Sequence, residues 1–178
     1  MDVKKVTKAV VAAGILALIA AAIAARPEFL RRRSGRDADR TLGVYAPTRE
    51  PVPRGVTVPE RDTENLLANI ARPAHVSLAG RGIAFRTFRI RAEKGAFAPD
   101  TVIVRQGDNV AVEITAVDRD YDFTLPDYSY SDLSIAKGKT ARVSFGATMT
   151  GKFTFFCVSC GGPEKGPKGV LIAVEEKK

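Results

Sequence analysis

Short apolar runs separated by turn residues fill the chain from residue 85 to the C-terminus, and they constrain the fold more than any other feature. Residues 85–90 alternate between two faces with period two, as in a strand that buries one face. Gly, Asp and Lys-Gly turns separate the later runs. Many short strands at this spacing predict an all-β sandwich with a single core. The expected strands are residues 85–90, 101–105, 110–117, 123–125, 140–145, 153–156 and 169–174.

An uncharged apolar block precedes this region, at residues 9–25. As a helix it spans about 26 Å at about 1.5 Å per residue, close to a hydrocarbon core of roughly 30 Å. Lys8 and Arg26 flank it and can reach the lipid headgroups, so we expect a short tail and one transmembrane helix within residues 1–25. The alternative is a cleaved signal peptide, because an Ala-x-Ala pattern lies at residues 22–24.

Basic residues lie on both sides of this block, so charge alone does not decide its orientation. The arginines after the block outnumber the lysines before it, which by the positive-inside rule would place the C-terminal side in the cytoplasm. Acidic residues interrupt these arginines, however, and a short lysine-led tail resembles a signal anchor. We expect a single-pass protein of the cytoplasmic (inner) membrane with a cytoplasmic N-terminus and a periplasmic C-terminal domain, an orientation that rests as much on the family resemblance described below as on charge.

The net charge of +8 is spread along the chain, and no segment has the dense basic stripe with interleaved aromatics of a nucleic-acid surface. We therefore expect no nucleic-acid partner. Arg31, Arg32 and Arg33 form a basic run just after the apolar block, and we interpret it as a contact with anionic lipid headgroups. The alternative is a docking site for an acidic partner.

Six of the ten prolines fall in residues 26–81, which predicts an extended linker rather than helix or sheet. A short helix near residues 63–71 is expected inside it, with a capping residue before it and Pro73 after it. Two turns are not stable alone, so we interpret the segment as a docking helix, or else as a helix packed on its own β domain. The β-sandwich domain is expected at residues 82–178. The apolar face of the helix consists of Leu66, Leu67 and Ile70.

Cys157 and Cys160 follow an aromatic strand and are separated by two residues. A disulfide is the first interpretation, because the expected compartment is oxidising and a C-x-x-C turn can close. A thiol pair that captures soft Cu(I) or Zn with outside ligands, and a redox-active dithiol, remain open. Pro163 and Pro167 favour a loop without a helix here. Haem attachment is excluded, because Gly161 stands where histidine is required.

The order of several phrases resembles the cupredoxin family, most closely the periplasmic copper domain of cytochrome c oxidase subunit II and of nitrous oxide reductase. The resemblance covers roughly residues 85–176 and implies a Greek-key β-sandwich. The membrane anchor also resembles that oxidase subunit, which has two such helices. The phrases are KGAFAPDTVIVRQGDNVAVEI, YDFTLP, AKGKTARVSF, GKFTFFCVSCG and KGVLIAV.

The same resemblance implies which positions would hold copper, and the chain departs from the pattern at each of them. Tyr121 stands where the family has histidine before an aromatic-x-aliphatic-Pro phrase. Cys157 and Cys160 are one residue too close, and Glu164 and Pro167 stand where histidine and methionine are expected. Two thiolates without imidazole do not build a blue or dinuclear copper site. We therefore expect no metal and no other cofactor.

The remaining chemistry-bearing residues favour structural roles. His75 is the only histidine and is expected at the surface or in packing. The aspartates around Tyr121 lack the spacing of a calcium loop and are interpreted as a solvated loop. Tyr128 and Tyr130 are interpreted as loop packing or interface anchors. Because no catalytic constellation is present, we expect neither an enzyme nor a small-molecule substrate.

These observations together predict a non-catalytic accessory subunit of a membrane electron-transfer complex, either respiratory and oxidase-like or a photosynthetic reaction centre. Its partners would be integral membrane subunits. The alternative is a periplasmic thiol-redox or copper-handling module that uses Cys157 and Cys160, and a third possibility is a periplasmic binding protein released by signal cleavage. The candidate docking residues are Arg31, Arg32, Arg33, Leu66, Leu67, Ile70, Tyr128 and Tyr130.

Overall fold

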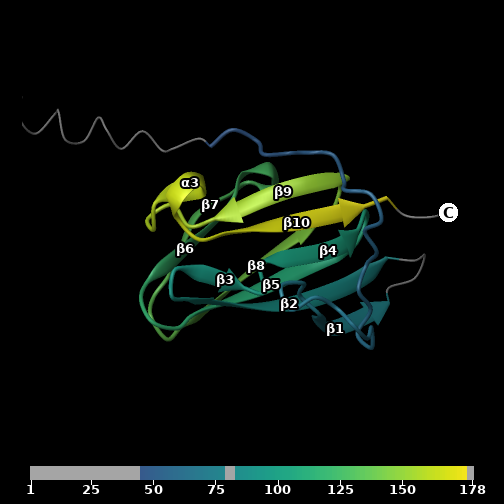
Figure 1. Ribbon diagram of the computed structural model, residues 1–178, viewed down its shortest axis with the longest axis horizontal. Coiled ribbons are helices and arrows are strands. Elements are labelled where there is room, and N and C mark those ends of the chain that lie inside the picture. The colour runs from purple at the N-terminus through teal and green to yellow at the C-terminus, as the bar shows by residue number, and fades with distance from the viewer. Residues whose placement is uncertain (1–44, 79–82, 176–178) are drawn as a thin grey trace, which may run out of the picture. The chain divides into compact units, whose positions relative to one another are not determined.

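The computed structural model describes residues 45–78 and 83–175, which form two β-sheets packed face to face (Figure 1). One sheet has the order β1-β2-β5-β8, with β3 paired to β2, and the other has the order β4-β10-β9-β6-β7. The all-β sandwich expected from the strand pattern is confirmed. The first sheet contains β1 (Pro73–Leu78), β2 (Ala84–Glu93), β3 (Ala96–Ala98), β5 (Asn109–Ala116) and β8 (Thr140–Gly146). The second contains β4 (Thr101–Arg105), β6 (Tyr121–Leu125), β7 (Tyr130–Ile135), β9 (Gly151–Phe156) and β10 (Lys168–Val174).

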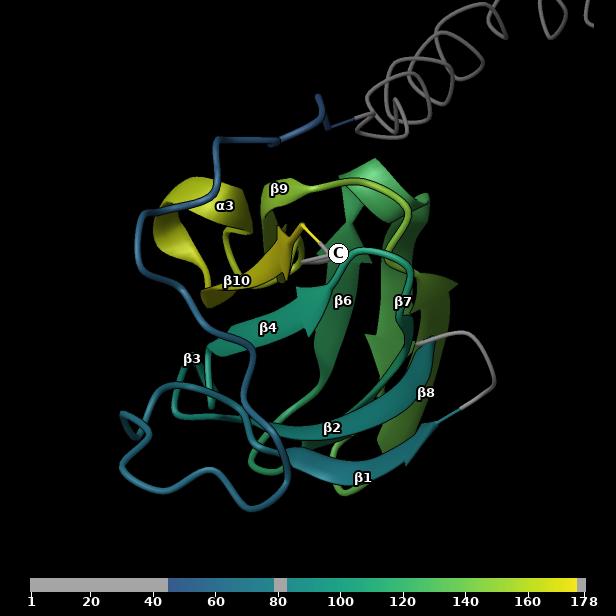
Figure 2. The same ribbon diagram turned by 90° about the vertical axis from the view of Figure 1, so that its right-hand side faces the viewer.

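Most neighbouring strands pair antiparallel, but each sheet holds one parallel pair. β2 pairs parallel with β5, and β10 pairs parallel with β4. The chain therefore crosses between the sheets rather than folding as a series of hairpins, and Figure 2 shows the two layers from the side. Two short helical turns complete the described elements: η1 (Pro126–Tyr128) and α3 (Gly162–Lys165).

The core lies between the sheets because the strands alternate between buried and exposed residues. Along β2, Phe88 and Ile90 are buried, whereas Phe85 and Arg89 face the solvent. β6 is buried along its whole length. Phe97, Phe123 and Phe155 meet in the centre with ring centroids 5.3–6.5 Å apart. Aromatic rings in edge and tilted arrangements contribute more than their buried area alone.

The proline-rich segment packs on its own β domain from Tyr45 onward. Thr48 accepts a hydrogen bond from the backbone N–H of Thr154, and Glu50 forms an isolated bridge with Lys152. Strand β1 begins at Pro73, so the sandwich starts earlier than the expected residue 82. The sequence left two interpretations of this segment open, docking to a partner and packing on its own β domain. Its described part packs on its own β domain.

Residues 63–71 form turns and a bend instead of the expected short helix. The backbone of this stretch pairs with another segment: the N–H of Ala71 donates to the carbonyl of Thr101, and the N–H of Thr101 donates to the carbonyl of Asn69. Asn65 also has a φ of 56°, in the left-handed region, which interrupts a right-handed helix. Long-range pairing therefore outweighs the local helical signal.

No helix among residues 45–78 and 83–175 is long and apolar enough to cross a membrane. The transmembrane helix expected at residues 9–25 lies outside the described residues, as do Arg31, Arg32 and Arg33.

Candidate functional site

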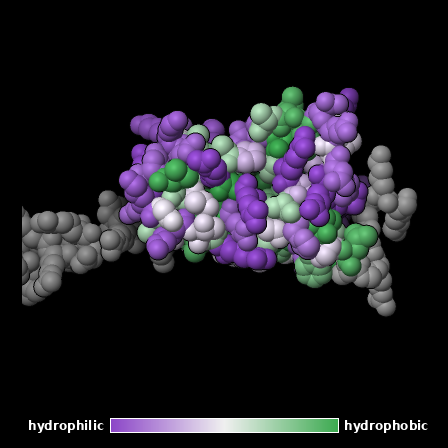
Figure 3. Space-filling view, turned by 90° about the horizontal axis from the view of Figure 1, so that it is seen from below, coloured by the Kyte–Doolittle hydropathy of each residue, from purple (hydrophilic) through white to green (hydrophobic). Residues whose placement is uncertain are grey.

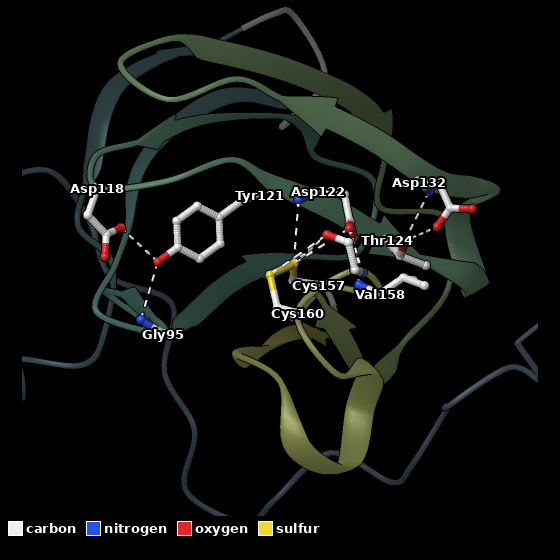
Figure 4. The surroundings of a disulfide bond; sticks show 10 residues. Gly95, Asp118, Tyr121, Asp122, Thr124, Asp132, Cys157, Val158 and Cys160 are labelled. Carbon is white, nitrogen blue, oxygen red and sulfur yellow. Dashed lines mark hydrogen bonds between the residues drawn. A yellow bond between two sulfur atoms is a disulfide. The ribbon is translucent and has the colours of Figure 1, made fainter.

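The cysteines lie at one end of the sandwich, where β9 leads into the turn before α3. Cys157 and Cys160 form a disulfide with their Cα atoms 5.4 Å apart, so the expected disulfide is confirmed. Cys157 is buried, and Cys160 is partly exposed. Figure 4 shows the disulfide beside Asp122, with Tyr121 further along the same strand.

One helical turn follows Cys160, which corrects the expected helix-free loop. Pro163 stands near the start of α3, where its missing N–H costs no intrahelical hydrogen bond. Gly162 has a φ of 70°, a conformation that glycine adopts without strain, and its N–H donates to the carbonyl of Cys157. Glu164 is exposed on this turn, whereas Pro167 is buried and its carbonyl accepts from the N–H of Cys157.

Asp122 holds the turn that contains the disulfide. Its carboxylate accepts the backbone N–H of Val158 at 2.6 Å and that of Ser159 at 2.7 Å. The Sγ of Cys157 lies 3.5 Å from both the carboxylate and the backbone nitrogen of Asp122. A buried carboxylate is stabilised by such N–H donors. Sequence reasoning placed Asp122 in a solvated acidic loop; the missed signal was its position within an otherwise apolar strand.

Tyr121 is a buried, fully hydrogen-bonded residue at the position where the family resemblance implies a ligand. Its hydroxyl donates to Asp118 at 2.9 Å and accepts from the N–H of Gly95 at 3.2 Å. The guanidinium of Arg119 lies 5.0 Å from the ring centroid. Hydrogen bonds from the Lys94 N–H and the Tyr121 hydroxyl hold the pKa of Asp118 below its usual value. Tyr121 thus ties the start of β6 to the turn between β2 and β3.

The donor groups at this end do not fit a copper ion. The two sulfur atoms are bonded to each other, so neither is a thiolate, and the Tyr121 hydroxyl is engaged by Asp118. Glu164 lies exposed on α3, and His75 lies exposed on β1 in the other sheet. Within the described parts of the chain, no group of three or more His, Cys, Asp or Glu residues is arranged to hold a metal ion.

An ion cluster that sequence reasoning missed connects the proline-rich segment to the sandwich; Arg86 and Asp108 are buried in it, whereas Glu60 and Arg105 are partly exposed. The Arg86 Nε donates to Asp108 at 2.7 Å, and the remaining guanidinium nitrogens reach Glu60 and the carbonyl of Pro59. Arg105 also bonds Glu60, at 2.8 Å. Burial lowers the pKa of Arg86, but the hydrogen bonds and charges of Glu60 and Asp108 outweigh it and raise the pKa overall.

Among the predicted docking residues of the described segments, Tyr128 and Tyr130 both pack on Phe145, whereas Leu66, Leu67 and Ile70 differ in exposure. Leu67 is 69% exposed, whereas Ile70 is partly buried beside the edge of β4. Tyr128 packs against Phe145 and Phe153, and burial raises its pKa to about 12. The Tyr130 hydroxyl bonds both backbone groups of Ser144. Leu66 is partly buried.

Comparison with known proteins identifies the architecture. A family model described as "Cupredoxin-like domain" matches residues 68–173. A comparison with curated proteins gave no match.

Solved structures with a similar fold are distant in sequence. The chain is 18% identical to the Cu(I)-bound metal-binding domain of the Cu(I)-exporting P-type ATPase CopA of Streptococcus pneumoniae D39, over 56% of this chain and 93% of that one, with a TM-score of 0.45. It is 17% identical to auracyanin A of Chloroflexus aurantiacus, over 50% and 98%, with a TM-score of 0.42. It is 19% identical to a multicopper oxidase, over 61% and 48%, with a TM-score of 0.48.

Proposed function

Starting from the fact that this chain belongs to the cupredoxin-like domain family, we propose that it is a non-catalytic accessory subunit of a membrane electron-transfer complex. The complex would be a respiratory, oxidase-like assembly or a photosynthetic reaction centre. The subunit would act by contact, with a membrane anchor in residues 1–25 and a copper-free sandwich on the periplasmic face of its partners.

One observation carries this proposal: the end of the sandwich that the family resemblance assigns to copper is built here from residues with structural roles. Cys157 and Cys160 close a turn, Asp122 fixes that turn, and Tyr121 connects β6 to the turn between β2 and β3. A copper site of the blue or dinuclear type needs thiolate and imidazole donors. What remains for function is the shape and surface of the domain.

Two further features support the membrane and periplasmic parts of the proposal. A disulfide is expected to persist in an oxidising compartment such as the bacterial periplasm. The apolar block at residues 9–25 is rich in alanine and contains Gly14, and small residues let transmembrane helices approach closely.

Purification of the native full-length chain after gentle solubilisation tests the proposal. We expect the chain to migrate with a cytochrome or pigment–protein complex and to carry no stoichiometric copper. Migration as a small free species, or a metal absorption band that belongs to this polypeptide, would contradict the accessory role.

The partial exposure of Cys160 favours one second candidate, a periplasmic thiol-redox module. A partner dithiol would attack Cys160, form a mixed disulfide and release Cys157 as a thiol, and a second thiolate of the partner would then complete the reduction. Redox titration of the chain distinguishes the two functions. A disulfide that cycles at a potential near that of known periplasmic oxidoreductases supports this second function, and one that resists such buffers supports the accessory role.

A further inference from the structure

A groove of about 420 Å³ opens on the outer face of the first sheet, the face that Figure 3 shows. It lies at the start of β2, whereas the end of β2 leads to Gly95 and the Tyr121 hydroxyl near the disulfide. The groove and the family's copper region are therefore at different ends of the sandwich. The side chains that line the groove include Phe85, Thr87, Asn109, Ala111, Arg142 and Ser144.

Phe85 gives the groove an exposed apolar side chain. It is 49% exposed, whereas Phe88, three residues further along β2, points into the core and is fully buried. The register places Ser77 opposite Phe85 on the groove face, whereas Leu78 lies opposite the buried Ala84 and so belongs to the other face of the sheet. Phe85 is therefore the exposed large apolar side chain of the groove wall.

Arg142 lines the groove, Arg89 and Arg91 follow on the exposed face of β2, and all three extend further into the solvent than their acidic neighbours. Arg89 and Arg142 both pair with Glu113, at 3.2 and 3.6 Å, but their side chains are 75% and 59% exposed against 26% for the glutamate. Arg91 is 63% exposed against 31% for its partner Glu93. Exposed ion pairs are weak, so the guanidiniums can exchange these carboxylates for those of a partner.

We propose that this groove binds an acidic segment of a partner protein, which inserts one apolar side chain against Phe85 and places carboxylates on Arg89 and Arg142. An apolar anchor in a pocket with charged residues at the rim is the usual anatomy of a specific contact. Charge complementarity selects an acidic partner over a basic one, because Arg89 and Arg142 share one acidic neighbour, Glu113, and extend further into the solvent than it does. The inference rests on the proposed function, because it assigns the partner to the host complex.

Site-specific crosslinking in native membranes tests the groove directly. The full-length chain would carry a photoreactive benzophenone side chain at position 144, on the exposed β8 side of the groove. We expect a crosslinked peptide from a subunit of the host complex, with a net negative charge in its sequence. Arg142→Glu should reduce the crosslink yield about tenfold, and higher salt should reduce it further.

A matched variant separates the groove from general effects of charge. Lys168→Glu reverses an exposed charge on β10 in the other sheet. This control should leave the crosslink yield unchanged, whereas Phe85→Ser should lower it about tenfold. The thermal midpoints of Arg142→Glu, Lys168→Glu and Phe85→Ser show whether each variant folds.

The outcomes also separate this inference from the proposed function. If the chain migrates with a host complex but position 144 crosslinks to nothing, to lipid or to a second copy of the chain, the groove inference is wrong and the accessory role stands. If the chain migrates alone, the accessory role fails whatever the crosslink shows. A crosslinked segment with a net positive charge, or equal yields from Arg142→Glu and Lys168→Glu, would also overturn the inference.

Discussion

Tyr121 shows how a position where the family resemblance implies a copper ligand can serve packing instead. Its ring lies in the core beside Phe97, and its hydroxyl is satisfied at the surface end by Asp118 and Gly95. A buried tyrosine needs such a partner for its hydroxyl. The residue therefore contributes both apolar burial and a polar connection between β6 and the β2–β3 turn.

Tyr121→Phe is expected to keep the fold and lower the free energy of unfolding by about 1 kcal/mol, because two hydrogen bonds are lost while the ring remains. Urea unfolding of the purified chain measures the change. An unchanged free energy of unfolding would show that the hydroxyl contributes nothing to stability.

Asp122→Asn is expected to lower the free energy of unfolding by more than Tyr121→Phe does, by about 1–3 kcal/mol. The reason is that Asp122 is buried and that one N–H of the disulfide turn loses its charged acceptor. Asp120→Asn is the matched control, since Asp120 accepts one N–H, from Lys137, at an exposed site. Urea unfolding of both variants should show the larger loss for Asp122→Asn. Equal losses would contradict a special role for the Asp122 carboxylate.

At the scale of the elements, the described part of the proline-rich segment lies on the sandwich, where ion pairs and backbone hydrogen bonds hold it. Glu60 bridges Arg86 on β2 and Arg105 on β4, and the backbone of residues 69–71 pairs with Thr101. A proline-rich chain offers few internal hydrogen bonds, so contacts to another surface must order it. Those contacts also explain why the local helical signal at residues 63–71 does not prevail.

Glu60→Gln is expected to destabilise the protein at neutral pH and progressively less in acid. Burial raises the pKa of Glu60, but the hydrogen bonds and charges of Arg86 and Arg105 outweigh it and lower the pKa below 4.5. A lowered carboxyl pKa stabilises the fold above the unfolded value, and this stability is lost as the pH falls through the folded value. The difference in thermal midpoint between wild type and Glu60→Gln should therefore be constant near neutral pH and shrink below pH 4.5.

Glu64→Gln is the control for this experiment, because Glu64 is exposed in the same segment. It should change the midpoint at neutral pH by less than Glu60→Gln does. A difference that persists undiminished in acid would contradict the ion-pair explanation.

At the scale of the whole molecule, the described residues divide into two ends with different characters. One end contains the disulfide, Asp122 and Tyr121, and its polar groups are satisfied within the domain. The other end presents Leu78, Ile83 and Phe85 to the solvent. The internal hydrogen bonds of the first end favour a structural role, and the exposed apolar residues of the second favour a contact.

Cys157→Ser is expected to leave electron transfer by the assembled host complex near the wild-type rate, because the proposed role is contact. The same change should lower the free energy of unfolding of the chain by about 2 kcal/mol, since the lost crosslink closed only a short loop. Turnover per assembled complex and urea unfolding are the two measurements. Loss of turnover in a fully assembled complex would contradict the structural role.

Local sequence patterns were sufficient to predict the parts of this structure that depend on residues close to one another in the chain. Short apolar runs between turn residues located most of the strands, and the spacing of Cys157 and Cys160 together with the expected oxidising compartment favoured a disulfide between them. The replacement of family ligands at Tyr121, Glu164 and Pro167 was also visible in the sequence alone, through the family resemblance.

Contacts between residues far apart in the chain decided the rest. Alternation places Arg86 on the face of Phe88 and Ile90, but its partners Asp108 and Glu60 are visible only in the fold. The sequence likewise suggested a loop aspartate at Asp122, and only the structure shows the turn at Val158 folded over it. The groove likewise exists only where β2, β5 and β8 lie side by side. Whether a charge is buried and where a groove opens both depend on how the sheets pack. The free energy of a buried charge depends on which distant groups replace the water around it.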